Sequence, residues 1–184
     1  MNLSTRDLII TALFTSLTIV GTFIAIPIGP VPINLQSFFV VLSGLILGAK
    51  LGALSQITYV ILGLIGLPVF SGGNGGLGAI VSPTFGFLMS YIVAAYVIGK
   101  LTEKNKSISK IIYSVILGSI VIYIIGVPYF YFIFTSFLGK SINFYSALKY
   151  ACLPFIPGDI IKAVIAISLA KQLIPRLSKY SNKN

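Results

Sequence analysis

The 184-residue chain is strongly apolar, with 57% hydrophobic and only 9% charged residues, and its formal net charge is +10. Soluble domains carry about a quarter of charged residues, so this composition excludes an ordinary cytosolic enzyme and a disordered chain. It indicates an integral membrane protein of six short-looped helices, each of about 20 residues. No length remains for a soluble domain, and we expect residues 1–184 to form one transmembrane domain.

Six apolar segments are predicted along the chain, and each is expected to be a helix. Open strands cannot satisfy their backbone polar groups in lipid, and the alternating pattern of a membrane barrel is missing. The second segment is short and could pair with the third as a re-entrant hairpin, while Pro128 interrupts the fifth. The segments cover residues 8–28, 35–49, 51–67, 83–99, 111–137 and 155–174.

The basic residues are distributed unevenly across this arrangement. Only Lys140 and Lys149 fall on the side opposite the termini, and Lys162 lies within the sixth segment. Because loops rich in Lys and Arg stay in the cytoplasm, we expect a plasma-membrane protein with both termini cytoplasmic. Topology thus explains the positive charge without nucleic-acid binding. The other ten basic residues fall on the same side as the termini: Arg6, Lys50, Lys100, Lys104, Lys106, Lys110, Lys171, Arg176, Lys179 and Lys183.

Three longer connections are expected on the outer side, at residues 27–34, 68–82 and 138–157. The second is rich in glycine, and the third is expected to contain an amphipathic helix around residues 144–153. A glycine-rich loop can fold over a ligand and offer its amides, and irregular backbone is tolerated where it lines a cavity. A plain flexible connector explains the same composition equally well.

The scarcity of reactive side chains limits the possible chemistry. The chain has no histidine, a single cysteine, Cys152, and three acids, Asp7, Glu103 and Asp159. This composition argues against the usual metal sites and against Ser-His or Cys-His nucleophiles. We therefore expect no catalytic residue, no metal ligand and no cofactor.

Two nucleotide-binding patterns are present only in part. Residues 73–78 match G-x-G-x-x-G, but the motif follows an apolar helix and lacks the acidic residue expected about 20 positions later. Residues 139–141 read Gly-Lys-Ser, yet the first glycine of a P-loop would fall at Phe134. We therefore expect that the chain does not hydrolyse ATP by itself.

The sixth segment contains the clearest functional signal, Asp159 and Lys162. An ionised side chain costs roughly 2.5–3.5 kcal/mol at the centre of a membrane helix. The spacing of three places both groups on one helix face, where their attraction returns only about 0.2–0.5 kcal/mol. A polar cavity or a ligand is therefore expected beside them. The alternative is that Asp159 caps the helix and that Lys162 extends toward the interface.

Other candidates map to the same outer face. Gln36 begins the second segment, and Asn74 lies in the glycine-rich loop; each amide can both donate and accept hydrogen bonds. The aromatic residues Phe70, Phe85 and Tyr91 flank that loop and could line an apolar pocket.

Small residues recur at a spacing of four, which allows helices to approach closely. The pattern predicts either packing within this chain or docking onto another membrane protein. It includes Ala12 and Ser16, Gly44, Gly48 and Gly52, and Ala166 and Ala170.

Four stretches of the chain together resemble the BioY family of biotin-specific substrate-binding (S) components of energy-coupling factor (ECF) transporters. The stretches are GPVPINLQ at 29–36, YVILGLIGLPVFSGGNGG at 59–76, PTFGF at 83–87 and PGDIIK at 157–162. The resemblance covers essentially the whole chain. It implies a compact bundle of six transmembrane helices with a vitamin pocket near the extracellular face.

The resemblance also implies specific roles and partners. It implies that Asn74, Asp159 and Lys162 contact biotin, the transported ligand. Ala12 and Ser16 would dock onto a T component that works with two ATPase subunits. We expect the remaining candidates to border the same pocket: Gln36, Gly73, Phe85 and Tyr91.

Two other functions remain open at this point. An ion-coupled secondary transporter would use Asp159 as a titrating group, and an S component for another small vitamin would share the same architecture. An intramembrane enzyme is disfavoured, because histidine is missing and acids are scarce.

Overall fold

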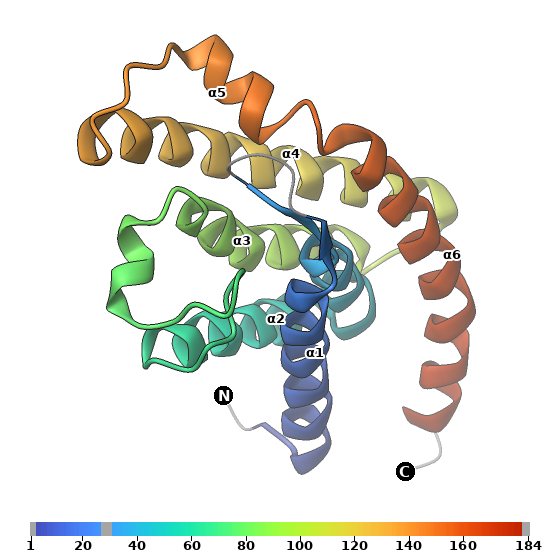
Figure 1. Cartoon of the computed structure of the whole chain (residues 1–184). Coiled ribbons are helices and arrows are strands. Elements are labelled where there is room, and N and C mark those ends of the chain that lie inside the picture. Colours follow the sequence, from blue (N-terminus) through green and yellow to red (C-terminus); the bar gives the residue numbers. More distant parts are fainter. Residues whose placement is uncertain (1–2, 27–30, 182–184) are drawn as a thin grey trace.

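A computed structural model of the protein describes residues 3–26 and 31–181, with side chains up to residue 175. Residues 27–30 of the first predicted outer loop, and Lys183, lie outside the described residues. Most of the described chain is helical (Figure 1). The elements are α1 Thr5–Phe23, β1 Ala25–Ile26, β2 Ile33–Asn34, α2 Gln36–Leu64, η1 Leu77–Val81, α3 Phe85–Thr102, α4 Ile108–Phe132, η2 Ile133–Phe137, α5 Phe144–Ala151 and α6 Ile156–Ser181.

The helices have the length and apolarity of membrane spans. Among the described residues, α1, α2, α3 and α4 with η2 are each long and apolar enough to cross a membrane. A fifth span is possible if α5 and α6, which meet at an angle of 46°, are taken together. The short strands β1 and β2 form a single antiparallel pair of two residues each. The predicted all-α membrane fold is confirmed.

Helix α2 is a hairpin, because the backbone reverses at Gly48. This residue has φ of 79° and ψ of −174°, which is non-helical. In a straight helix, Gln36 and Tyr59 would lie about 34 Å apart. Instead the Gln36 side-chain nitrogen is 2.5 Å from the Tyr59 hydroxyl. The predicted segments 35–49 and 51–67 are therefore two antiparallel arms, and together with α1, α3, α4 and α6 they correspond to the six predicted segments.

Some predicted boundaries were wrong. The first segment was expected to reach residue 28, but α1 ends at Phe23 and the chain continues as β1. Pro128 was expected to interrupt the fifth segment, but α4 continues through it. A proline is tolerated in a membrane helix where neighbouring groups satisfy the freed carbonyl. The irregular turn comes later, as the π-helical η2 followed by Gly139 with φ of +62°.

Most of the small-residue pattern serves internal packing. A Cβ atom on Gly44 would lie 2.8 Å from the carbonyl oxygen of Ala95 on α3, so the two helices are in backbone contact there. Ala166 and Ala170 of α6 are fully buried against the cluster that contains Phe14. Close packing of this kind explains why these positions are small.

Ala12 and Ser16 differ from the other small residues because they lie on the exposed face of α1. The same face carries exposed Leu8, Leu13 and Val20. Figure 1 shows both termini at one end of the molecule, with α5 and the first turns of α6 at the opposite end.

Candidate substrate-binding site

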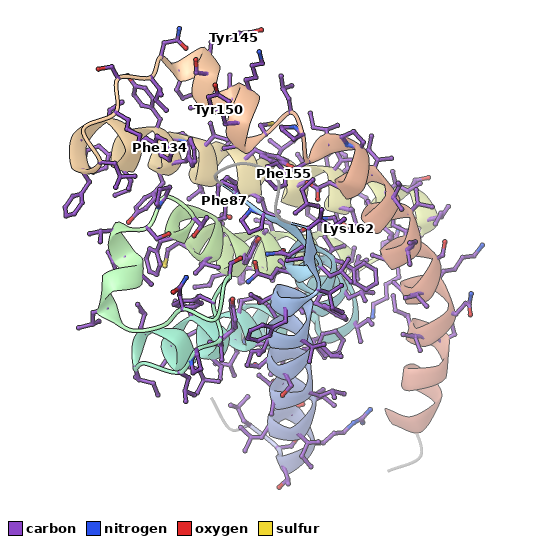
Figure 2. The ribbon with its side chains drawn as sticks, viewed as in Figure 1. Phe87, Phe134, Tyr145, Tyr150, Phe155 and Lys162 are labelled. Carbon is purple, nitrogen blue, oxygen red and sulfur yellow. The ribbon has the colours of Figure 1, made fainter. Side chains whose placement is uncertain are left out.

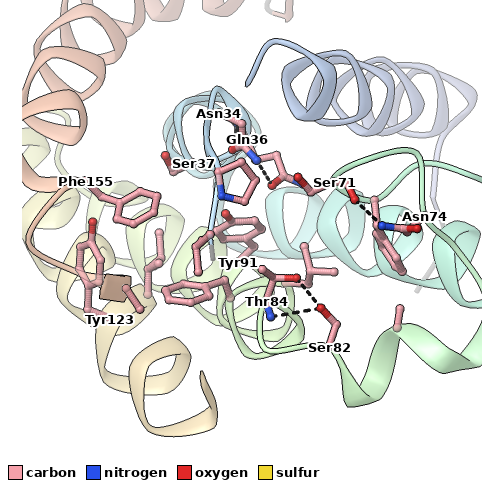
Figure 3. Close-up of a pocket in the computed structure, with 18 of the residues that line it drawn as sticks. Asn34, Gln36, Ser37, Ser71, Asn74, Ser82, Thr84, Tyr91, Tyr123 and Phe155 are labelled. Atoms are coloured by element: carbon pink, nitrogen blue, oxygen red, sulfur yellow. Dashed lines mark hydrogen bonds between the residues drawn. The ribbon is translucent and has the colours of Figure 1, made fainter. Parts of the chain in front are cut away.

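A cavity of about 240 Å³ lies among loops and helices of the bundle (Figure 3). This volume is far more than a single ordered water needs. Its wall is built from residues 31–37, from the loop between α2 and α3, from α3 and α4, and from the junction of α5 and α6. Segments distant in sequence thus converge on one cavity, as is usual for small-molecule sites.

The cavity is charged at one end by Asp159 and Lys162. The Lys162 Nζ atom is 2.5 Å from Asp159 Oδ1, and the two side chains are only 12% and 21% exposed. Both line the cavity, and Figure 2 shows Lys162 directed from α6 toward the interior of the bundle. Lys162 therefore does not extend along the helix toward the membrane surface.

Neighbouring helices supply partners for both charges. Ser37 and the Tyr123 hydroxyl donate hydrogen bonds to the two carboxylate oxygens of Asp159. Lys162 donates to the backbone oxygen of Asn34 at 3.2 Å and to Ser37 Oγ at 2.6 Å. Removing charges from water is costly unless they are paired and hydrogen-bonded. This network explains how an ion pair is tolerated within an apolar bundle.

A second polar group on the wall is the amide of Gln36, which is 3% exposed. Its oxygen accepts a hydrogen bond from Asn34 Nδ2 at 2.7 Å, and its nitrogen donates to Tyr59 at 2.5 Å. The Tyr59 hydroxyl in turn lies 3.2 Å from the backbone oxygen of Val69. Gln36 is therefore held from both sides of its amide.

The glycine-rich loop folds back onto α2. Phe70 and Asn74 form an antiparallel bridge, and the Asn74 amide donates to the Ser71 carbonyl at 2.9 Å. The Gly76 amide donates to the backbone oxygen of Gly63 at 2.7 Å. The loop is thus anchored beside the cavity, which it lines with Asn74 and other residues, and the reading as a plain connector is disfavoured.

The structure places Asn74, Asp159, Lys162, Gln36 and Tyr91 on the cavity wall, as the sequence suggested. The apolar part of the wall includes Tyr91 of α3 and, among others, residues that the sequence prediction did not select. These are Phe87, Leu88, Ile122 and Phe155. Phe70, which the sequence also suggested, lines the cavity as well.

Two predicted site residues do not line the cavity, and these predictions are corrected. Phe85 is buried against Tyr129, with ring centroids 6.2 Å apart, because the start of α3 turns this position toward α4. Phe87, two positions later, takes the place on the wall. Gly73 lies at the exposed tip of the loop with φ of +73°, where it shapes the turn.

Sequence reasoning also missed Ser37, Tyr123 and Asn34. Ser37 follows Gln36 directly, and Tyr123 stands between isoleucines at 122 and 124. A polar residue surrounded by aliphatic residues in a membrane helix is a usable signal, because such groups usually face a partner. The partner of Ser37 and Tyr123 is Asp159, 36 or more residues away in sequence, and Asn34 accepts from Lys162 through its backbone oxygen.

Comparison with known proteins gives consistent matches over nearly the whole chain. The BioY family model matches residues 1–179. The chain is 42% identical over 173 residues to the biotin transporter BioY of Thermotoga maritima, and the alignment covers 91% of this chain and 95% of that protein. It is 38% identical to the biotin transporter BioY of Rhizobium etli, with coverages of 94% and 95%.

Solved structures share the architecture. A crystal structure of the S component for biotin from an ECF-type ABC transporter is similar with a TM-score of 0.72 and 31% sequence identity, covering 94% of both chains. The S component of another bacterial ECF transporter matches with a TM-score of 0.62 at 20% identity, which supports the fold alone.

Proposed function

Because this chain belongs to the BioY family, we propose that it is the biotin-binding S component of an ECF-type transporter. The observation that carries this proposal is the cavity that has the Asp159–Lys162 pair and several aromatic side chains on its wall. Relatives over the full length are named biotin transporters. The chain would capture biotin and would have no enzymatic activity of its own.

The chemistry of the cavity suits biotin. The ureido group of biotin has two N–H donors and one carbonyl acceptor, and its valerate chain ends in a carboxylate. Asp159 can accept from an N–H, while Lys162 and Asn74 can donate to the ureido carbonyl or to the carboxylate. Gln36 and Tyr91 would border the ligand, and the aromatic wall would cover the apolar ring and chain. No metal or cofactor is required for this recognition.

The protein is a multi-pass membrane protein, and we infer that both termini face the cytoplasm of the plasma membrane. Ten of the thirteen basic residues fall near the termini or in the connections that the sequence assigns to the same side, and such residues favour the cytoplasmic side. The cavity would then open toward the outside, where biotin is captured. Delivery inward would require a T component and two ATPase subunits, since the sequence lacks a complete P-loop.

The exposed face of α1 is the proposed docking surface for the T component. The Ser16 hydroxyl donates a hydrogen bond to the Ala12 carbonyl at 3.0 Å, so its polar group is already satisfied within the helix. The side chains at both positions are small, and the surface of α1 is therefore flat there. Small side chains let another helix approach closely, whereas contact with lipid would not require them.

Replacing Ala12 or Ser16 by tryptophan should impair uptake and spare biotin binding. A bulky side chain in a close interface costs about 1–3 kcal/mol, so we expect cellular uptake with the other subunits present to fall roughly tenfold. Ile124→Trp is the matched control, because Ile124 is 65% exposed on α4 and belongs to a different face. Normal uptake by both α1 variants would place the docking surface elsewhere.

Calorimetric titration of the purified protein with biotin tests the proposed function directly. We expect saturable binding of one biotin per chain, and no comparable heat with thiamine or riboflavin. Preferential binding of one of those vitamins would make the protein an S component for another ligand. Biotin uptake into proteoliposomes under an imposed ion gradient, without any ATPase, would instead favour a secondary transporter.

A further inference from the structure

A chain of buried hydrogen bonds leads from the cavity wall into the bundle through Asn34, Gln36 and Tyr59. Asn34 and Gln36 line the cavity, but Tyr59 is fully buried behind them and is not among the lining residues. The direction of each hydrogen bond in this chain can be derived, because each end meets a backbone group with a fixed role.

At the outer end, the backbone N–H of Gln36 can only donate, and it donates to Asn34 Oδ1 at 3.1 Å. The amide nitrogen of Asn34 must therefore face the Gln36 side chain, and it lies 2.7 Å from Gln36 Oε1. This fixes the Gln36 amide with its oxygen toward Asn34 and its nitrogen toward Tyr59.

At the inner end, the Tyr59 hydroxyl accepts from Gln36 Nε2 and keeps its own hydrogen for another partner. The candidates are the backbone oxygen of Val69 and Thr22 Oγ1, both at 3.2 Å. The Val69 carbonyl can only accept, and the Thr22 hydroxyl gives its hydrogen to the Thr18 carbonyl at 3.0 Å. Tyr59 therefore donates inward, and its oxygen stays available as an acceptor for Gln36.

Turning the Gln36 amide over would place nitrogen against nitrogen at Asn34 and leave a buried donor without its acceptor. Leaving such a group unsatisfied is costly. The Tyr59 ring is itself held edge-to-face against Phe70, with centroids 5.6 Å apart, and Phe70 lines the cavity. Gln36, which lines the cavity, is thus held in one amide orientation.

We propose that Tyr59 is a positioning residue that fixes the orientation of the Gln36 amide and thereby tunes biotin affinity without touching the ligand. This inference rests on the proposed function. It assigns to a buried residue on the second arm of α2 an effect on binding that is transmitted through Gln36 alone.

A double-mutant cycle tests the inference. Tyr59→Phe removes only the hydroxyl, and we expect the Kd for biotin to rise by about 3- to 10-fold, as for one lost hydrogen bond. In a Gln36→Leu background, the same change should leave the Kd unaltered, because the amide it positions is gone. Tyr113→Phe is the matched control, since Tyr113 is 52% exposed on α4 and away from the cavity.

A general structural role of Tyr59 would raise the Kd by the same factor in both backgrounds, and that result would overturn the inference. So would an unchanged Kd for Tyr59→Phe alone. If the Tyr59 variant fails to fold, Asn34→Ala replaces it in the double-mutant cycle, because Asn34 holds the oxygen end of the Gln36 amide. We expect the same coupling with Gln36→Leu. Failure of the wild-type protein to bind biotin would overturn the proposed function as well, whereas uncoupled losses in a protein that binds biotin would overturn this inference alone.

Discussion

Replacing Asp159 by asparagine is expected to weaken biotin binding by about 10- to 100-fold, the range for a hydrogen bond to a charged group. The asparagine keeps the size and shape of the side chain, and its oxygen can still accept from Ser37 or Tyr123. It loses the negative charge, which leaves Lys162 without its charged partner in a site where that lysine is 12% exposed. Affinity is measured by calorimetric titration of the purified variant.

The same variant should remain folded, because the polar network around position 159 stays largely occupied. Size-exclusion chromatography of the purified protein checks this point. Glu103→Gln provides the matched control: Glu103 also pairs with a lysine three residues away, Lys100, but this pair is on the surface. Wild-type affinity in Asp159→Asn would contradict the assignment of Asp159 to the biotin site.

The sequence revealed the charged end of the site because burial of charge has a large local cost. Asp159 and Lys162 stand out within an apolar segment without any knowledge of the fold. Their stabilising partners do not stand out, since Ser37 lies 122 positions before Asp159 and becomes relevant only when α2 packs beside α6. Partner identity is a property of tertiary structure.

The rotation of a helix about its axis, which decides which side chains face the cavity, likewise could not be predicted from the sequence. Phe85 and Phe87 are both aromatic and both next to the glycine-rich loop, yet only Phe87 lines the cavity. The choice depends on how α3 packs against α4, where Phe85 meets Tyr129. Composition predicts that aromatic residues line the site but does not select among neighbours.

The fold itself was more accessible, because hydrophobic length is a local property. The apolar segments were predicted close to their observed positions, whereas the connection between the second and third was left open. Gly48 was interpreted as part of a packing stripe with Gly44 and Gly52, and its backbone conformation reveals a different role as the reversal point of α2. Spacing alone cannot distinguish a glycine needed for close packing from one needed for a turn.

Gly48→Ala is expected to destabilise the protein by about 1–3 kcal/mol, because φ of 79° with ψ of −174° belongs to a region that is essentially restricted to glycine. A Cβ atom at Gly48 would meet no other atom within 4 Å, so the effect is conformational rather than steric. The turn cannot relax easily, since Gly99 of α3 packs against it so closely that a Cβ there would lie 2.2 Å from the Ala49 nitrogen. The apparent melting temperature should fall by about 2–4 °C per kcal/mol.

Gly158→Ala separates this backbone effect from the general effect of adding a methyl group. Gly158 lies in helix α6 with no positive φ, and a Cβ there would make only an ordinary contact of 3.9 Å with Ile33. Alanine favours helix more than glycine does, so the melting temperature of the Gly158→Ala variant should equal or exceed that of the wild-type protein. Because the reversal at Gly48 brings Gln36 to Tyr59, the Gly48 variant should also bind biotin more weakly. An unchanged melting temperature together with unchanged affinity would mean that α2 reverses without the backbone conformation of Gly48.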